Sequence, residues 1–392
     1  MLIEIIAFLF LGMLAGTFSG LIPGIHINLV GAALVSFSYL IAANPILLAV
    51  FITAMAITHT FIDFIPSIFL GCPETDTALS VLPGHQMLKK GRAYEAIMLT
   101  AHGCLAAIFL LLILSFPLAF IFSHIYNQIT FLIPYILILV ILSMIFLEKN
   151  KFSAIVVVAL TGILGLLTLN IELNQPLLPL LSGLFGSSSL ILSLNAKTKI
   201  PKQIISFSKY KIFKPLLGAI IASPLCGFLP GLGSGQAAII GNFFSKTNNK
   251  GFLILLGATN TLVMGFSFVS LYAIAKARTG AAVAVQSILG IISLKILILL
   301  LIVSLITGIL SFFLTKILAK FLSKNIEKIN YSILSTATLI FLTILVGLIS
   351  GWTGLFIFIT STLTGIYCIN TQTKRTNMMG CLLIPTIVLY LL

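Results

Sequence analysis

Two similar stretches decide how this chain folds: FSGLIPGIHIN at residues 18–28 and LCGFLPGLGSG at residues 225–235. Each places a Pro-Gly pair, Pro23-Gly24 or Pro230-Gly231, inside strongly apolar sequence. Proline removes a backbone donor and glycine tolerates non-helical dihedral angles, so each pair predicts a break in a helix. Broken backbone at membrane depth is tolerated only where it is buried in protein or lines a watery cavity. We therefore predict two broken-helix, re-entrant hairpins.

The rest of the composition predicts an all-α, polytopic protein of the cell membrane. The 392 residues are 59% hydrophobic and only 8% charged, whereas a soluble domain carries about 25% charged residues. Apolar runs of about twenty residues, enough to cross a ~30 Å hydrocarbon core, recur along the chain. Residues 1–18 are interpreted as the first membrane helix rather than a signal peptide. Further spans are expected at Pro45–Phe64, Ala96–Phe122, Gln128–Leu147, Phe152–Leu169, Leu177–Leu194, Phe252–Ile274, Ser287–Leu314, Tyr331–Ser350 and Gly351–Ile369.

The net charge of +14 belongs to short loops between the apolar runs. This distribution is typical of the positive-inside rule and predicts that the basic loops are cytoplasmic. Nucleic-acid binding is not expected, because no basic soluble domain exists to carry it. The two richest loops contain Lys197, Lys199, Lys202, Lys209, Lys211 and Lys214, and Lys316, Lys320, Lys324 and Lys328.

The two halves of the chain repeat each other. Besides the Pro-Gly stretches, Thr-His-Thr at 58–60 aligns with Thr-Asn-Thr at 259–261, and residues 161–166 align with 350–355. The predicted domains are a first transmembrane repeat (1–195), a basic cytoplasmic linker (196–214) and a second transmembrane repeat (215–392). Internal duplication is frequent in secondary transporters, and an odd number of spans in each half would invert the repeats. We expect inversion, because Ala237–Phe244 is too short to cross.

The hairpins are the predicted binding site for an anion. A helix that restarts after a break directs unpaired N–H groups and its positive dipole end at the cavity, which suits a carboxylate or phosphate. A single Pro-Gly would be a structural kink, but two copies at equivalent positions favour a functional role. Arg278 could add a bidentate anion contact or be an ordinary loop charge. The remaining candidate binding residues are Pro23, Gly24, His26, Asn28, Pro230, Gly231, Gly233, Ser234, Gly235 and Gln236.

Four further polar residues are candidates for ion coupling. His59 and Asp63 are spaced i, i+4 and share a helix face within an apolar span, where ionisable groups are costly. They could accept a proton or hold sodium; alternatively, Asp63 lies at the span end, in water or as a helix cap. Glu74 and Asp76 lie in the densest polar stretch, residues 71–85, which is a cation site, a solute gate or a solvated loop. No zinc-type spacing is present, so no metal or other cofactor is expected beyond H⁺ or Na⁺ as coupling ion.

Three motifs carry a resemblance to a known family: GLIPG at 20–24, PETDTALSVLPGH at 73–85 and GFLPGLGSG at 227–235. The chain resembles the large membrane subunit of tripartite tricarboxylate transporters (TctA-like), in a shorter, stand-alone archaeal-type branch. This resemblance implies an ion-coupled permease for anionic carboxylates that works with a solute-binding protein and a small membrane subunit. It also implies the hairpin role for Pro23, Gly24, Pro230, Gly231, Gly233 and Gly235.

Together these observations predict a secondary active transporter, not an enzyme, for a small organic anion such as a di- or tricarboxylate, coupled to H⁺ or Na⁺. The alternative is a flippase for a polyprenyl-phosphate lipid carrier, whose family has a similar pair of Pro-Gly hairpins. An enzyme using His59, Asp63 and Glu74 is disfavoured, because no nucleophile–base pair or metal set is present. The expected partners are the anionic solute or lipid phosphate and membrane lipids. A small subunit, a solute-binding protein and a homodimer stay open.

Overall fold

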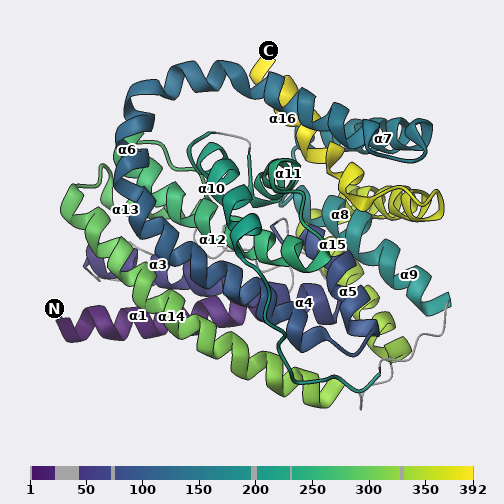
Figure 1. Ribbon diagram of the computed structural model, residues 1–392, viewed down its shortest axis with the longest axis horizontal. Coiled ribbons are helices and arrows are strands. Elements are labelled where there is room, and N and C mark those ends of the chain that lie inside the picture. Colours follow the sequence, from purple (N-terminus) through teal and green to yellow (C-terminus); the bar gives the residue numbers. More distant parts are fainter. Residues whose placement is uncertain are drawn as a thin grey trace. The chain divides into compact units, whose positions relative to one another are not determined.

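The computed structural model describes residues 2–22, 44–71, 76–195, 201–229, 232–326 and 331–391, and within them the chain is helical without strands (Figure 1). The predicted all-α membrane architecture is confirmed. Seven helices of the described part are long and apolar enough to cross a membrane: Leu2–Leu21, Pro45–Phe69, Ala93–Tyr126, Lys151–Asn170, Asn249–Ile274, Leu294–Asn325 and Ser335–Asn370.

The chain divides into two compact units. Unit 1 comprises Met1–Ile65, Ile97–Tyr126 and Phe207–Lys320, and unit 2 comprises Pro66–Ala96, Asn127–Ser206 and Phe321–Leu392. Each half of the sequence therefore contributes its beginning to unit 1 and its end to unit 2. The division into two repeats, inverted or not, stays a prediction.

Unit 1 is built from long helices packed in pairs. α1 runs alongside α3, and α10 packs against both α11 and α12 (Figure 1). A single helix, α6, contributes its middle to unit 1 and its two ends to unit 2. The bounds are α1 Leu2–Leu21, α3 Pro45–Ile62, α6 Ala93–Phe146, α10 Phe213–Phe228, α11 Ser234–Ser245, α12 Asn249–Ile274, α13 Gly280–Leu289 and α14 Leu294–Asn325.

Several helices start where a side chain caps the free backbone donors of the first turn. The Asn44 carboxamide oxygen accepts from the Ile46 N–H at 3.0 Å, with Pro45 at the first helical position of α3. Asn248 caps α12 by accepting from Gly251, and Thr279 caps α13 by accepting from Ala282. Asparagine and threonine are preferred at this position because their side-chain oxygens replace the missing intrahelical acceptor. These starts are therefore encoded locally.

Glycines determine how closely the helices of unit 1 approach. A Cβ at Gly16 would lie 2.4 Å from the Met55 carbonyl oxygen, and one at Gly257 would lie 2.1 Å from that of Thr100. Such contacts pair α1 with α3 and α6 with α12. Small residues let helix backbones approach in membrane proteins, where packing rather than the hydrophobic effect drives association.

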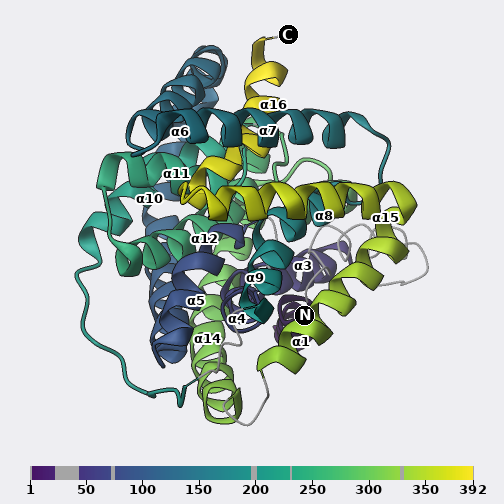
Figure 2. The same ribbon diagram turned by 90° about the vertical axis from the view of Figure 1, so that its right-hand side faces the viewer.

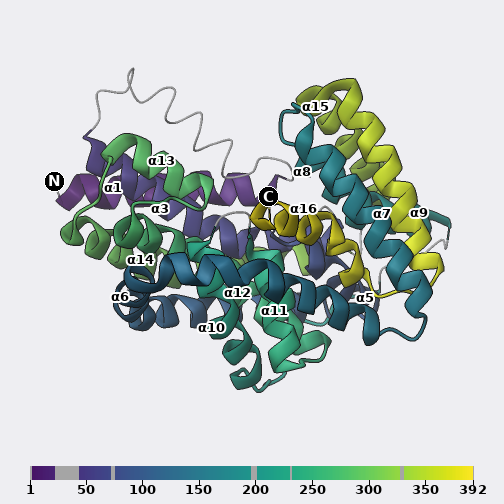
Figure 3. The ribbon, with the colours of Figure 1, turned by 90° about the horizontal axis from the view of Figure 1, so that it is seen from above.

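Unit 2 is organised around the long helix α15. This helix packs against the consecutive segments α8, η2 and α9, and α7 packs against α16 (Figures 2 and 3). The Ser187 and Thr362 hydroxyls meet at 2.5 Å between η2 and α15. The bounds are α4 Phe64–Phe69, η1 Ala78–Ser80, α5 Val81–Lys89, α7 Lys151–Asn170, α8 Leu177–Leu181, the π-helical η2 Ser182–Ser187, α9 Ser188–Asn195, α15 Tyr331–Asn370, η4 Arg375–Met379 and α16 Gly380–Leu391.

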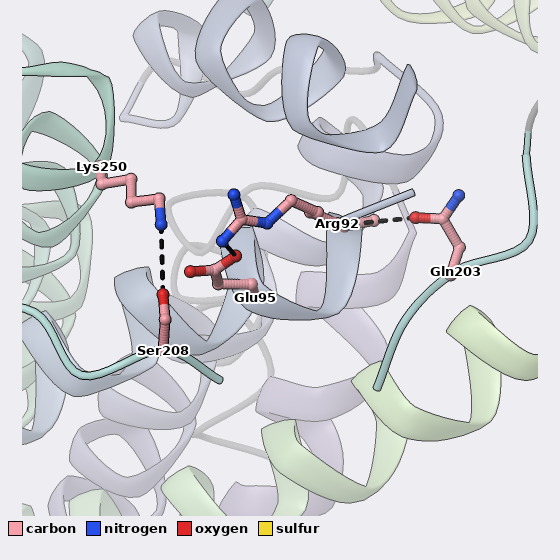
Figure 4. Close-up of polar contacts among 6 residues, drawn as sticks. Arg92, Glu95, Gln203, Ser208 and Lys250 are labelled. Atoms are coloured by element: carbon pink, nitrogen blue, oxygen red, sulfur yellow. Dashed lines mark hydrogen bonds and ion pairs between the residues drawn. The ribbon is translucent and has the colours of Figure 1, made fainter. Parts of the chain in front are cut away.

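The described part of the predicted basic linker is anchored by polar contacts (Figure 4). Gln203 accepts from the Ala93 N–H at 2.9 Å, at the start of α6, where Arg92 and Glu95 form an ion pair of 2.5 Å. Further along, Lys250 donates to the Ser208 hydroxyl at 3.1 Å. The linker is thus attached to unit 2 through Gln203 and to unit 1 through Ser208.

Three predicted helix boundaries were wrong. The expected span Ser287–Leu314 is split, because α13 ends before Gly290, whose φ of +66° is incompatible with a right-handed helix. No break separates Phe122 from Gln128, since the intervening residues include neither glycine nor proline. α14 continues to Asn325 through three lysines expected in a loop, because lysine forms helices well and favours their C-terminal ends: Lys316, Lys320 and Lys324.

The break expected between Ser350 and Gly351 is present as a kink in α15 (Figure 2). Gly351 has φ 64° and ψ −160°, a region that only glycine adopts readily. We expect Gly351→Ala to destabilise the protein by about 1–3 kcal/mol, read as a lower thermal unfolding midpoint in detergent. No atom lies within 4 Å of a Cβ there, so the loss would come from the backbone alone.

The matched control is Gly347→Ala, one turn earlier in the same helix. A Cβ at Gly347 would meet Leu355 at an ordinary 3.6 Å, and alanine favours a helix over glycine by roughly 1 kcal/mol. This variant should keep or raise the midpoint. Equal midpoints for the two variants would show that the kink carries no backbone strain for alanine.

Candidate functional site: a buried polar junction in unit 1

Polar side chains from α3 and α12 meet inside unit 1, although both helices are predominantly apolar. His59, Asp63 and Asn260 are 3%, 1% and 3% exposed. We call the group the α3–α12 junction. Its members are Ser19, Thr58, His59, Thr60, Asp63, Cys104, Asn260, Thr261 and Ser311.

The Asp63 carboxylate is the central group of the α3–α12 junction. Its Oδ2 accepts a hydrogen bond of 2.8 Å from the Asn260 amide, which also donates to the Thr60 carbonyl at 3.4 Å. Asp63 is the residue at which α3 ends, and its own N–H donates to the His59 carbonyl at 3.0 Å. Asp63 is buried where α3 meets α4, inside the candidate span Pro45–Phe69, so the alternative in which it lies in water is wrong.

Burial makes this position unfavourable for a negative charge, because the Asp63 side chain is only 1% exposed. Taking a carboxylate out of water costs several kcal/mol. A proton or a small cation at Asp63 would relieve this penalty.

His59 faces the preceding helix. Its Nδ1 lies 3.0 Å from the Ser19 hydroxyl of α1, one residue before Gly20, where a Cβ would contact Ile62 at 2.9 Å. The close approach of α1 and α3 at this glycine brings the serine within reach of the imidazole. His59 and Asp63 are thus held by different neighbours, Ser19 of α1 and Asn260 of α12.

The two triplets that the sequence aligned are in direct contact. The hydroxyls of Thr60 and Thr261, the last residue of each triplet, are 3.0 Å apart. Contact between equivalent residues is what a two-fold relation between repeats would produce. The Ser311 hydroxyl of α14 donates to Thr58 at 3.0 Å, and Cys104 of α6 donates to the carbonyls of Thr60 and Gly257. With Ser19 of α1, five helices of unit 1 therefore contribute to the α3–α12 junction: α1, α3, α6, α12 and α14.

The start of α11 is the described part of the second predicted hairpin. Ser234 and Gln236 are 2% and 4% exposed, and Gly233 and Gly235 lie beside them in the first turn. The Gln236 side-chain oxygen accepts the Gly233 N–H at 3.0 Å. One of the backbone donors expected to face an anion is therefore occupied by Gln236, which acts as a helix cap.

Arg278, the predicted bidentate anion contact, lies against Tyr126. Its Nη2 donates to the Tyr126 hydroxyl at 2.8 Å, and Lys276 Nζ lies 4.7 Å from the centre of the same ring. The Arg278 and Thr279 N–H groups both donate to the Ser267 hydroxyl. Part of the guanidinium is thus used to hold the loop between α12 and α13.

The polar stretch at 71–85 is not a solvated loop in its described part. Asp76 precedes η1, and the apolar side chains that follow, Ala78, Leu79, Val81 and Leu88, are at most 5% exposed. Seven candidate residues lie outside the described residues: Pro23, Gly24, His26, Asn28, Glu74, Pro230 and Gly231.

Sequence reasoning missed the partners that complete the junction. Asn260 and Thr261 were recognised only as part of the internal repeat, and Ser19 and Cys104 were given no role. A usable signal did exist for Asn260: a carboxamide in the middle of a long apolar run is costly unless it has a partner.

Comparison with known proteins gave one family match and one similar protein. Residues 6–380 match the family model described as the tripartite tricarboxylate transporter TctA family. The chain is also 32% identical, over 398 residues covering 98% of each chain, to a protein of Methanocaldococcus jannaschii described as uncharacterized. No solved structure matches. The family match covers nearly the whole chain, and this protein therefore belongs to the tripartite tricarboxylate transporter TctA family.

Proposed function

We propose that this protein is a secondary active transporter that moves a small organic anion, such as a di- or tricarboxylate, and couples its movement to H⁺ or Na⁺. The observation that carries the proposal is the buried carboxylate of Asp63, held by Asn260 between two apolar helices. Family membership supports a transporter of anionic carboxylates. The coupling ion and the substrate are our inference.

The α3–α12 junction has the chemistry that a coupling site needs. Asp63 can take up a proton, or it can provide a negative oxygen ligand for Na⁺. The hydroxyls of Thr60 and Thr261 lie at the same helix crossing, and hard cations prefer oxygen ligands. Binding the cation would cancel the charge of Asp63, and releasing it would restore the desolvation penalty. A conformational change that exposes Asp63 first to one side of the membrane and then to the other would therefore couple the ion gradient to movement of the anion.

The predicted hairpins are the proposed place for the anion itself. α11 begins at Ser234 with Gly233 and Gly235 beside it, so backbone can approach a ligand closely there. A helix N-terminus directs its positive dipole end at the ligand. The name of the family also leads us to propose a small membrane subunit and a solute-binding protein as partners.

The proposal is tested by uptake into liposomes. Purified protein is reconstituted, and labelled succinate and citrate are offered under an inward H⁺ gradient, an inward Na⁺ gradient, or neither. We expect accumulation driven by one of the two gradients and abolished when an ionophore collapses it, with protein-free liposomes as control. No uptake across a broad panel of di- and tricarboxylates would contradict the proposal. A thermal shift with polyprenyl phosphate but not with citrate would favour the lipid-carrier flippase instead.

A further inference from the structure

Unit 2 contains a cavity of its own, outside the α3–α12 junction. Its volume is about 200 Å³, enough for a phosphate or a small carboxylic acid. The polar part of the lining comes from α5, from α9 and from the start of η4. The residues that provide it are His85, Gln86, Lys89, Ser189 and Arg375.

The charge of this lining is positive. Lys89 and Arg375 contribute a cation each, and among the described residues no aspartate or glutamate lines the cavity. Partial burial of the ammonium group, followed by the positive charge of Arg375, lowers the pKa of Lys89. Glu148 is used by the backbone and side chains around η4: its Oε1 accepts from the Lys374 N–H at 3.0 Å and from the Asn377 amide at 2.9 Å. Within the part of the chain that the structure describes, the two cations therefore face the cavity without a carboxylate on its wall.

His85 is the second, independent indication of a ligand. Its side chain is 7% exposed, and within the described residues neither ring nitrogen has a hydrogen-bond partner. Burial, together with the positive charges of Lys89 and Arg375, lowers the pKa of His85 to about 3, so the imidazole is neutral. The ring packs on Gly71, where a Cβ would lie 2.5 Å from Nε2. A buried polar group without a partner is costly and rare in folded proteins.

We propose that this cavity binds a compact oxyanion, that is, a carboxylate or phosphate group. Arg375 is positioned for it by Ser189, whose hydroxyl accepts from one guanidinium nitrogen at 2.6 Å and leaves the other N–H donors without a hydrogen-bond partner among the described residues. Lys89 supplies a second charge at the mouth of the cavity, and His85 supplies a neutral N–H donor. An oxyanion would satisfy the histidine and reduce the repulsion between the two cations. The site rests on unit 2 alone and does not depend on the proposed transport.

The test is direct binding by the full-length protein purified in detergent. Sodium phosphate, citrate and chloride are titrated calorimetrically at constant ionic strength. We expect saturable binding of phosphate or citrate and none of chloride. Arg375→Gln and Lys89→Gln should each weaken binding by about tenfold or more, because each removes a charge-assisted hydrogen bond.

Lys90→Gln is the matched control. Lys90 is the exposed neighbour of Lys89 and does not line the cavity, so its loss should change the affinity by less than about twofold. If Arg375→Gln lowers the unfolding midpoint, Lys89→Gln decides the test, because the Lys89 side chain is exposed and its replacement leaves the packing of the fold unchanged. Absent or chloride-like binding, or equal effects of the Lys89 and Lys90 variants, would overturn the proposal.

Short-chain phosphatidic acid, titrated in parallel, distinguishes the source of the oxyanion. Tighter binding of phosphatidic acid than of inorganic phosphate, lost in Lys89→Gln, would assign the site to a lipid headgroup. Equal or weaker binding would assign it to a free anion. Because binding is measured without liposomes or gradients, a negative result here and a failure of uptake are separate outcomes.

Discussion

Asp63→Asn is expected to abolish gradient-driven uptake while leaving the fold intact. Asparagine has the same shape, and its carbonyl oxygen can accept the 2.8 Å hydrogen bond from Asn260, so the packing between α3 and α12 is kept. The variant can neither release a proton nor provide a charged ligand for Na⁺. Without a titratable or cation-binding group the coupled step is lost, so the initial gradient-driven rate should fall by about 100-fold or more, which corresponds to roughly 3 kcal/mol in the barrier.

The measurement is uptake by liposomes containing equal amounts of folded protein. Glu4→Gln is the control, because Glu4 is an acid of the same unit that lies exposed on α1, and its loss should leave the rate within about twofold. Exchange of labelled for unlabelled substrate without a gradient should survive in Asp63→Asn if Asp63 serves coupling alone. Normal gradient-driven accumulation by Asp63→Asn would remove this residue from the mechanism.

Gly257→Ala is expected to cause a large loss of stability from a single methyl group. The added Cβ would lie 2.1 Å from the Thr100 carbonyl oxygen and 2.8 Å from its carbonyl carbon, and both are backbone atoms that no rotamer change can move. α6 and α12 would have to separate, which also removes the Cys104 contact to the Gly257 carbonyl. Overpacking costs about 1–3 kcal/mol even where side chains yield, so the loss should exceed that range.

Thermal unfolding in detergent, with the yield of monodisperse protein, measures this effect. Gly103→Ala is the reciprocal change, since its Cβ would lie 2.1 Å from the Ile254 carbonyl oxygen, and it should be similarly damaging. Gly347→Ala has ordinary space around its Cβ and serves as the control. A midpoint for Gly257→Ala as high as that of the control would mean that the two helices do not cross here at the described distance.

Most of the helical architecture could be predicted from the sequence, because it follows from local properties. In a membrane each backbone group must be satisfied within its own helix, so apolar runs of sufficient length are helices. The starts at Asn44 and Asn248 and the kink at Gly351 are also local, because caps and positive φ angles depend on one residue and its neighbours. The helix end at Gly290 was missed because this glycine lies in apolar sequence, where hydropathy gives no contrast. A break between Phe122 and Gln128 was predicted in error, because the residues between them are mostly polar but include no helix breaker.

The candidate sites could be predicted only in part. The spacing of His59 and Asp63 placed both on one helix face, yet the donor to Asp63 comes from Asn260, almost half the chain away. His85 and Arg375 are separated still further, and nothing in either local sequence indicates that they line one cavity. Which polar groups meet depends on where helices cross, and the crossings depend on glycines such as Gly16 and Gly257.

By itself, the sequence determined that this protein is a helical membrane protein with two similar halves of sequence and a costly pair of ionisable residues in an early span. Hydrophobicity, helix caps and helix breakers act over a few residues, so they can be recognised without knowledge of the fold. The tertiary structure alone decided that Asp63 has Asn260 as its donor and that His85, Lys89 and Arg375 surround a cavity. Those contacts join residues far apart in the chain, and they arise only when close helix packing brings their backbones together.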